Sequence, residues 1–382
     1  MAKTYYFPPI VIMGPGAIEL IVPEIKRINV KKALIVTDKG LIKFGVVQKV
    51  LDILDKANIA YAIFSDVKPN PTLNNINDGY QALLDNACDY VISIGGGSPQ
   101  EAGKGIAILA TNPGDIRDYE GFGKTANKSI PIVAINTTAG TASEATMNYV
   151  VTDEERQIKM FIADPNCMPT IAVDDPLLML NIPAAPTAVT GMDALTHAVE
   201  GYTAGGATAF TDLFNLEAIK VISANLRTVV ADGHNLEARD QMAYGQFVTG
   251  MGFSNGGLGL VHGMAHPLGG FYDLTHGFCT AILLPYVMAF NADVLGNRLK
   301  DIAVALEIDV SHRELKEING LAIDAIKKLS KDVGMPSSLS EIGVKEKDFD
   351  ILADMALADY CTGANPKTPT KEEVIALYKA AF

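Results

Sequence analysis

The chain has 382 residues, with 31 Lys and Arg against 44 Asp and Glu, which gives a formal net charge of −13. This acidic balance argues against nucleic acid and anionic membrane surfaces as partners, because proteins that bind phosphate backbones need a basic stripe. A hydrophobic fraction of 48% with 20% charged residues is typical of a globular protein. The length predicts about two domains of roughly 150 to 200 residues.

The N-terminal residues and the cysteines bear on the cellular compartment. The opening Met-Ala-Lys-Thr-Tyr-Tyr-Phe-Pro-Pro has no basic segment followed by an apolar run, so no secretory signal is visible. The four cysteines, Cys88, Cys167, Cys279 and Cys361, are far apart and form no CxxC pair. We therefore expect no disulfide framework and a cytoplasmic protein.

Residues 1–182 alternate between short apolar runs and stretches of helical periodicity such as 74–84. This alternation predicts a parallel sheet with helices on both faces. The runs predicted as strands are residues 32–36, 60–64, 90–94, 130–135 and 170–173. Two further runs, 148–151 and 159–162, flank a charged turn and predict a surface hairpin. An edge strand is expected over 5–13, although two prolines there argue against long pairing.

Beyond Pro183 the pattern changes to helices, which we expect at 188–202, 209–229 and 235–251, with more toward the C-terminus. Prolines 176, 183 and 186 mark this change. The sequence therefore predicts an α/β domain over residues 1–182 and an all-helical domain over residues 183–382.

Loops that follow strands of a parallel sheet are where ligands bind. Gly95, Gly96, Gly97 and Ser98 follow an apolar run and precede a predicted helix. Backbone N–H groups in such a loop can approach a phosphate, and the helix N-terminus adds a partial positive charge. A tight strand-to-helix turn is the alternative, and three glycines in a row favour phosphate binding.

Two other loops are open to more than one interpretation. Thr137, Thr138 and Thr141 follow the run at 130–135 and could hold a ribose or pyrophosphate, but Thr is also an ordinary helix cap. Asp38 follows the run at 32–36; its carboxylate could accept hydrogen bonds from a ribose diol, or it could cap the next helix. No G-x-G-x-x-G fingerprint is present.

The histidines are concentrated in the second half. His197 lies four residues after Asp193, His266 lies four residues after His262, and His276 follows. Spacing of four places two side chains on one helix face. Residues 241–272 contain no Asp, Glu, Lys or Arg, and their Gly, Asn, Ser, His and Pro content argues against a membrane span.

This histidine-rich set predicts a metal or catalytic site. Oxygen with imidazole and no thiolate suits Fe(II), Zn, Mn or Co. Cys279 is a conceivable ligand, but its apolar neighbours fit a small core side chain equally well.

These motifs together resemble the iron-dependent (group III) alcohol dehydrogenases, and within them the enzymes that interconvert lactaldehyde and 1,2-propanediol. The matching segments are residues 95–99, 137–144, 191–200, 257–269 and 276–277. The resemblance implies a dehydroquinate synthase-like α/β nucleotide-binding domain, a helical metal-binding domain and a homodimer. It departs from the usual pattern at Glu101, Thr275 and Thr280.

The resemblance also implies roles for individual residues. The metal ligands would be Asp193, His197, His262 and His276. The histidine that assists proton movement would be His266. The NAD site would be lined by Asp38, Asn70, Gly96, Gly97, Ser98, Thr137, Thr138, Thr141 and Lys159. The substrate pocket would be lined by Asn148, Phe253 and Cys361.

The expected function is therefore NAD(H)-dependent interconversion of small aldehydes and primary alcohols or diols, with Fe(II), or else Zn, polarising the substrate oxygen. A 1,3-propanediol or short-chain alcohol dehydrogenase is the near alternative. A dehydroquinate synthase-like lyase should carry Lys and Arg near the metal for its anionic substrate, which the uncharged window lacks. A non-catalytic nucleotide- and metal-binding protein would need a partner surface or an effector domain.

Overall fold

The computed structural model describes residues 2–382, which divide into two compact units. The first consists of the residues up to Thr138 together with Ala142–Asn181, and the second of Ala139–Thr141 and Ile182–Phe382. None of the helices in the described residues is both long and apolar enough to cross a membrane.

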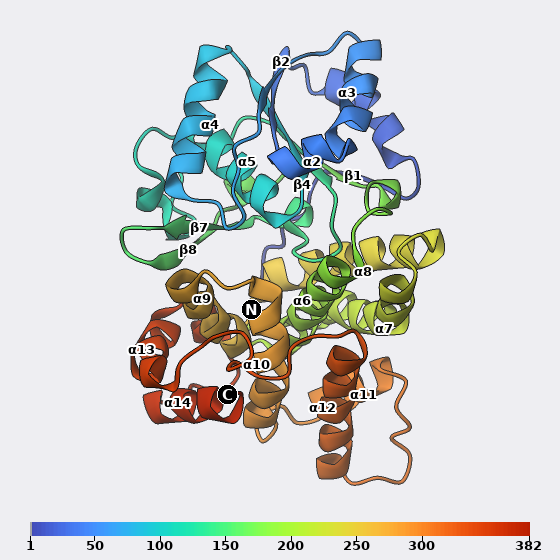
Figure 1. Ribbon diagram of the computed structural model, residues 1–382, viewed down its shortest axis with the longest axis vertical. Coiled ribbons are helices and arrows are strands. Elements are labelled where there is room, and N and C mark those ends of the chain that lie inside the picture. The colour runs from blue at the N-terminus through green and yellow to red at the C-terminus, as the bar shows by residue number, and fades with distance from the viewer. Residues whose placement is uncertain (1) are drawn as a thin grey trace. The chain divides into compact units, whose positions relative to one another are not determined.

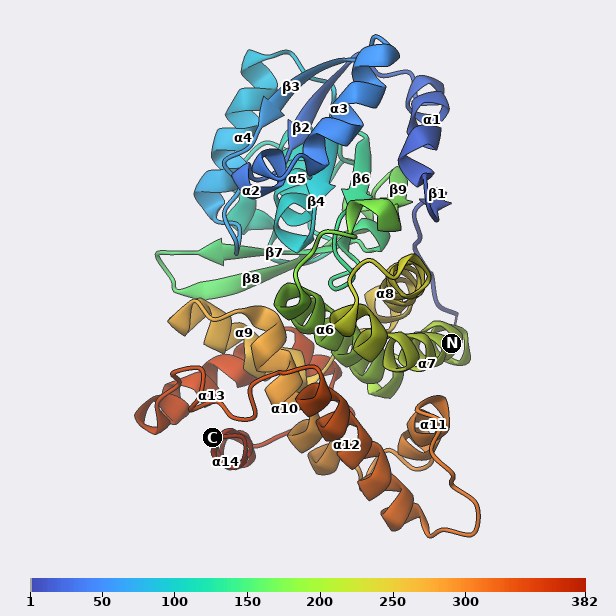
Figure 2. The same cartoon turned by 45° about the vertical axis from the view of Figure 1, so that its right-hand side comes forward.

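The first unit is built on a six-stranded sheet, in which every neighbouring pair is parallel. Its spatial order is β1 (Ile10–Met13), β9 (Ile171–Asp174), β6 (Ile132–Asn136), β4 (Tyr90–Gly95), β2 (Lys32–Val36) and β3 (Ala60–Phe64), as Figure 2 shows. The inner strands β9, β6, β4 and β2 are apolar runs because almost all of their residues are buried on both faces of the sheet. The five strands expected inside the domain are confirmed.

Helices cover both faces of this sheet. The first unit's helices are α1 (Ile21–Arg27), α2 (Lys39–Lys43), α3 (Val46–Lys56), α4 (Leu73–Asp85) and α5 (Gly97–Leu109). Leu34 joins one apolar cluster with Ile76 of α4 and Ile106 of α5. Its neighbour Ile35 joins the other cluster, which includes Leu54 of α3. Each buried aliphatic side chain of this kind contributes about 1.5–3 kcal/mol relative to exposure.

The expected edge strand over residues 5–13 is shorter than predicted, because β1 begins only at Ile10. Pro8 and Pro9 precede it, and proline has no N–H to donate to a strand ladder. The predicted hairpin is confirmed: β7 (Asn148–Asp153) and β8 (Ile158–Ala163) pair antiparallel. A short strand that the sequence did not predict, β5 (Gly121–Phe122), pairs with β8.

The second unit contains helices as its long elements (Figure 1). They are α6 (Ala184–Thr203), α7 (Ala209–Ala231), α8 (Leu236–Gly256), α9 (Leu260–Tyr272), α10 (His276–Asn291), α11 (Arg298–Ala305), α12 (Leu315–Asp332), α13 (Phe349–Ala358) and α14 (Lys371–Ala380). Helix α6 contacts α7, α8 and α10, while α9 contacts α10 and α13. The three helices expected after Pro183 are confirmed, and α8 extends to Gly256.

Local signals explain where these helices begin and how closely they pack. Thr208 and Thr211 exchange backbone and hydroxyl hydrogen bonds of 2.8 and 3.2 Å, which cap the start of α7. A Cβ on Gly252 of α8 would lie 2.1 Å from Oδ1 of Asn215 in α7, so the two helices approach where a side chain is missing. Helix α6 is buried along most of its length and is therefore the central helix of the unit.

Candidate active site

Helix α6 presents three buried ionisable side chains on one face. Asp193, His197 and Glu200 follow one another at intervals of four and three residues, which is the repeat of an α-helix surface. Their exposed fractions are 4%, 6% and 4%. Buried charges and imidazoles of this kind require partners, because desolvation is costly.

The two helices after α8 supply the remaining histidines. His262 and His266 lie one turn apart in α9, and His276 is the first residue of α10. Ligand atoms of Asp193, His262 and His276 all lie within 4.8 Å of one another. His197 adjoins this group: its Nδ1 is 3.8 Å from Asp193 Oδ2, and its ring centroid is 4.5 Å from that of His262. The structure therefore brings together the four residues expected to bind metal.

Buried neighbours fix the orientation of these side chains. Thr280 of α10 donates its hydroxyl to Asp193 Oδ1 over 2.9 Å. Glu200 Oε2 lies 2.5 Å from Nδ1 of His262. Phe253 of α8 stacks on His197 with ring centroids 4.5 Å apart and an interplanar angle of 18°. The cluster is therefore held by a hydroxyl, a carboxylate and an aromatic ring as well as by its own helices.

Two imidazole nitrogens of the cluster test whether it suits a metal. Nε2 of His262 and Nδ1 of His197 are buried and have no hydrogen-bond partner. Buried polar atoms are rarely left unsatisfied in proteins. Neutral imidazole nitrogens beside a carboxylate are the donor set that Fe(II) or Zn accepts. The residues therefore fit a divalent cation.

Burial and neighbouring charge act differently on the two histidines. Burial, helped by the nearby His262, holds the pKa of His197 well below its usual range. Burial also opposes charge on His262, but the hydrogen bond and the negative charge of Glu200 outweigh it and raise the pKa of His262. His197 is thus kept neutral, as a metal ligand must be.

A second group surrounds His266. Its Nδ1 is 2.8 Å from Asp359 Oδ2, and Asp359 Oδ1 accepts the backbone N–H of Cys361 over 2.8 Å. Its ring stacks on His276 with centroids 5.4 Å apart. Burial, followed by the charge of Asp359, raises the pKa of the Cys361 thiol well above its usual range. Cys361 therefore remains a neutral thiol, a small side chain rather than a nucleophile.

The glycine loop after β4 exposes backbone where a side chain would not fit. Gly95 has φ +155°, and a Cβ on it would lie 2.4 Å from Cγ of Pro99. A Cβ on Gly96 would lie 2.8 Å from Oγ1 of Thr138. Gly97 and Ser98 form the first turn of α5. The loop thus combines accessible N–H groups with a helix N-terminus, which suits a phosphate.

The loop after β6 lies beside the glycine loop. Thr137 donates its backbone N–H to the carbonyl of Gly95 over 3.1 Å, and its buried hydroxyl has no hydrogen-bond partner. Thr138 donates its N–H to Asn136 Oδ1 over 3.1 Å. Thr141 belongs to the short segment that is grouped with the helical unit. Thr137 and Thr138 therefore line the same end of the sheet as the glycines.

Three other predicted cofactor residues lie in the first unit. Asp38 caps α2, with its Oδ1 accepting the N–H of Leu41 over 2.9 Å. The capping role considered from the sequence is therefore present, and one carboxylate oxygen is used by it. Lys159 of β8 donates from Nζ to Oδ1 of Asn70 over 2.7 Å. Asn70 has φ 55°, a left-handed conformation that Asn tolerates better than most residues.

Two family models together match almost the whole chain. A model of the iron-containing alcohol dehydrogenases matches residues 8–176, and a model of the C-terminal part of the Fe-containing alcohol dehydrogenase family matches residues 187–382. The chain belongs to the iron-containing alcohol dehydrogenase family.

Relatives of this iron-containing alcohol dehydrogenase align along nearly its whole length. Lactaldehyde reductase of Escherichia coli is 48% identical over 371 residues, 97% of each chain. NAD-dependent methanol dehydrogenase of Bacillus methanolicus is 41% identical over 378 residues, 99% of each chain. A crystal structure of 1,3-propanediol oxidoreductase superposes with a TM-score of 0.98 at 44% identity, covering 100% of both chains. Membership of this family implies NAD(H) and iron as cofactors.

Two carboxylates beside the histidines of this iron-containing alcohol dehydrogenase, those of Glu200 and Asp359, were not predicted from the sequence. Glu200 lies three residues after His197 and shares the helix face of the predicted ligands, yet the resemblance gives it no role. Asp359 lies two residues before Cys361, and no spacing signal connects it with His266. The departure at Thr280 is explained by its contact with Asp193. At Glu101, Oε1 accepts the N–H of Val150 over 3.1 Å.

The remaining predicted substrate residue of this iron-containing alcohol dehydrogenase lies in the first unit. Asn148 is the first residue of β7, and its carbonyl accepts Nζ of the buried Lys104 over 2.6 Å. Desolvation lowers the pKa of Lys104 to about 8. Lys104 also donates to Ser143 and Thr146 over 3.1 Å each, so it ties together the segment between β6 and β7.

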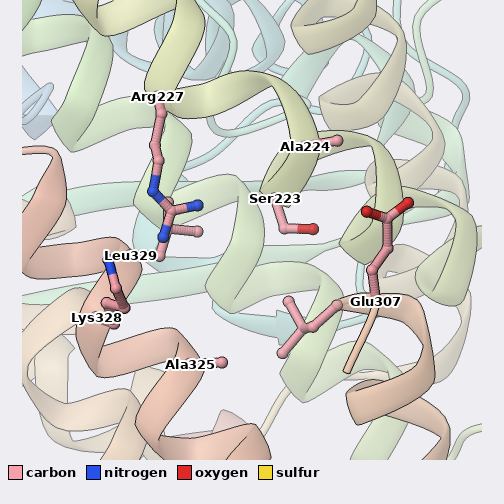
Figure 3. A pocket seen from close by; sticks show the side chains of 8 residues that line it. Ser223, Ala224, Arg227, Glu307, Ala325, Lys328 and Leu329 are labelled. Atoms are coloured by element: carbon pink, nitrogen blue, oxygen red, sulfur yellow. The ribbon is translucent and has the colours of Figure 1, made fainter. Parts of the chain in front are cut away.

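A pocket of about 270 Å³ elsewhere in the helical unit has a different character (Figure 3). It is lined by Ser223, Ala224, Arg227, Leu306, Glu307, Ala325, Lys328 and Leu329. Its two cationic side chains, Arg227 and Lys328, already form ion pairs with Asp332, over 2.8 and 2.7 Å. Its lining includes none of the predicted site residues of this iron-containing alcohol dehydrogenase.

Proposed function

We propose that this chain is an NAD(H)-dependent oxidoreductase that interconverts small neutral aldehydes and primary alcohols or diols, of the lactaldehyde and 1,2-propanediol type. The observation that carries the proposal is the group of Asp193, His197, His262 and His276, in which the first three are buried and the imidazoles of His197 and His262 each have a nitrogen without a hydrogen-bond partner in the described residues. These four residues would hold Fe(II). The bound cation supplies a Lewis acid for the substrate oxygen, and NADH supplies the hydride.

We assign to His266 the transfer of the proton to and from the substrate oxygen. With its Nδ1 held against Asp359, the other ring nitrogen is left to exchange a proton with the substrate. Imidazole is the side chain that most often carries out such proton transfer in enzymes. In aldehyde reduction His266 would donate to the substrate oxygen, and in alcohol oxidation it would accept the proton back.

The coenzyme is assigned to the loops of the first unit. Backbone N–H groups at Gly96, Gly97 and Ser98 would bind the pyrophosphate, with Thr137, Thr138 and Thr141 alongside. The hydrogen-bonded pair of Lys159 and Asn70 would line the same site. The carboxylate of Asp38 would accept the ribose hydroxyls, which favours NAD over NADP.

A small neutral substrate is supported by what surrounds the histidines. Phe253 is 4% exposed and Cys361 is 3% exposed, and neither carries charge. Residues 241–272 supply no Lys or Arg to hold an anionic substrate. Asn148 of the first unit is the third residue proposed to contact the substrate. The relatives named for lactaldehyde, 1,3-propanediol and methanol also support small alcohols, and a 1,3-propanediol or short-chain alcohol is the alternative substrate.

The test is a coenzyme assay with protein loaded anaerobically with Fe(II). We expect NADH absorbance to fall with lactaldehyde, and to fall more slowly with 3-hydroxypropanal and acetaldehyde. Parallel loading with Zn distinguishes the cations. His262→Ala should lose bound metal and activity together, whereas His312→Ala, an exposed histidine, should lose neither. If the metal-loaded protein turns over none of the small aldehydes or alcohols, the proposal is refuted. Light scattering of the same sample would test the proposed homodimer.

A further inference from the structure

Glu200 of α6 is a buried carboxylate that meets the first turn of α9 at three points. Its Oε1 accepts the backbone N–H of Val261 over 2.6 Å, and its Oε2 accepts the backbone N–H of His262 over 3.2 Å. The same Oε2 lies 2.5 Å from Nδ1 of the His262 ring. One carboxylate thus holds both the helix end and the imidazole that follows it.

These contacts assign the proton on the imidazole. Both oxygens of Glu200 accept backbone N–H groups, and a carboxylate only accepts hydrogen bonds. Nδ1 of His262 must therefore carry the hydrogen that points at Glu200. In the neutral ring Nε2 then has the lone pair, and Nε2 is the buried atom without a partner. A metal can bind only the nitrogen that has a lone pair.

The same helix end offers a natural comparison. Asn365 Oδ1 accepts the N–H of Leu260 over 3.2 Å, so it caps the turn that Glu200 also caps. Its other hydrogen bonds within residues 2–382 are to the side chain of Asn291 and to the carbonyl of Lys367, and neither partner is an imidazole. A Cβ on Gly259 would lie 2.9 Å from both Glu200 Oε1 and Asn365 Oδ1, so glycine there leaves room for both acceptors.

We propose that Glu200 is a positioning residue, which holds His262 as the Nδ1–H tautomer and so makes Nε2 the metal-binding nitrogen. The inference rests on the proposed function for the metal itself. This role is separate from helix capping, because Asn365 caps the same turn while its side chain hydrogen-bonds Leu260, Asn291 and Lys367.

Glu200→Gln tests this with almost no change of shape. Both carboxylate oxygens accept backbone N–H groups, so either orientation of the amide places its NH₂ against a backbone donor. The backbone contact at Oε1 is 2.6 Å and that at Oε2 is 3.2 Å, so the amide oxygen is expected at the closer contact, Oε1, and the NH₂ at Oε2. In that orientation Nδ1 of His262 must become an acceptor and the hydrogen moves to Nε2. Long-range ¹H–¹⁵N spectra of metal-free, histidine-labelled protein report the tautomer directly. Competition with a chelator reports the affinity for Zn²⁺ and Fe²⁺.

We expect wild-type His262 as Nδ1–H, and Glu200→Gln with hydrogen on Nε2 and metal affinity lower by about 10- to 100-fold. Asn365→Ala should lower the melting temperature but leave the tautomer and the metal affinity unchanged. An Nε2–H tautomer in the wild-type protein would overturn the inference even if no variant folds. An equal loss of metal affinity in Asn365→Ala would also overturn it.

The failure of this inference differs from that of the proposed function. If wild-type protein binds no divalent cation, the proposed function fails and the metal role of Glu200 fails with it. If wild-type protein binds the cation and Glu200→Gln binds it equally well, only the role of Glu200 fails.

Discussion

Thr280 donates its hydroxyl to Asp193 Oδ1 over 2.9 Å, and the exposed fractions of the two residues are 0% and 4%. The bond holds the orientation of the Asp193 carboxylate. Replacing Thr280 with Val keeps the shape but removes the donor. We expect a loss of about 1–3 kcal/mol of stability in the metal-free protein, because a buried acceptor loses its partner.

The same variant should bind Fe(II) about 10-fold more weakly, since residues that orient ligands influence affinity on this scale. Thermal unfolding and chelator competition measure the two effects. Thr280→Ser retains the hydroxyl and should restore most of both. Unchanged metal affinity in Thr280→Val would show that Asp193 needs no orienting partner.

Asp38 has two assigned roles, which a single substitution can separate. As the N-cap of α2 it accepts the N–H of Leu41, and Gly at an N-cap costs only a few tenths of a kcal/mol relative to Asp. Asp38→Gly should therefore fold normally while it removes the charge that is proposed to repel a 2′-phosphate. We expect kcat/KM with NADPH relative to NADH to rise by about 10-fold, a change worth about 1.4 kcal/mol.

Thr208→Gly is the matched control for Asp38, because it alters the N-cap of α7 in the helical unit. It should leave the coenzyme ratio unchanged. An unaltered ratio in Asp38→Gly would mean that Asp38 is only a cap.

Asp359 holds His266 through one oxygen and the chain through the other. Its Oδ2 is 2.8 Å from Nδ1 of His266, while its Oδ1 accepts the N–H of Cys361. Asp359→Asn can keep the contact with Cys361 and change only the partner of the ring. We expect kcat to fall about 10-fold with KM nearly constant, because a proton carrier contributes roughly 100-fold or more to catalysis.

Steady-state kinetics of His266→Ala provide the reference for Asp359. The double variant should be no slower than His266→Ala alone, since both residues act on one proton. If the losses of kcat in the two single variants multiply in the double variant, Asp359 does not act through His266.

The environment of Asp153 in the β7–β8 hairpin should make the stability of the fold depend on pH. Its Oδ2 accepts from Nε of Arg117 over 2.8 Å and from Nε of Arg156 over 2.6 Å. The hydrogen bond from Arg117, aided by Arg156, holds the pKa of Asp153 well below its usual range. A depressed carboxyl pKa stabilises the fold above the unfolded value of about 4, and this contribution is lost as the pH falls further.

Asp153→Asn should lower stability at pH 7 by about 2 kcal/mol, the scale of hydrogen bonds to charged groups. The difference from wild type should shrink in urea titrations below about pH 4, where the unfolded carboxyl takes up a proton. Glu155→Gln removes an exposed partner of Arg117 and should change stability little. A difference that is constant with pH would contradict the assignment.

The sequence alone predicted the architecture and a histidine-rich metal or catalytic site, and its resemblance to the family implied the proposed ligands. Apolar runs such as 32–36 predicted a parallel sheet because strands buried on both faces leave no polar alternation. Intervals of four residues, as between Asp193 and His197, predicted pairs on a single helix face. Both inferences depend on local periodicity, and local periodicity is fixed by covalent geometry.

Only the tertiary structure decided which groups orient those ligands. Glu200 and His262 are 62 residues apart, His266 and Asp359 are 93 apart, and Asn70 and Lys159 are 89 apart. No repeat in the chain relates such positions, because each contact depends on how separate helices or strands pack. The tautomer of His262 is therefore set by packing, since a carboxylate from another helix must arrive beside Nδ1 before the ring can present Nε2.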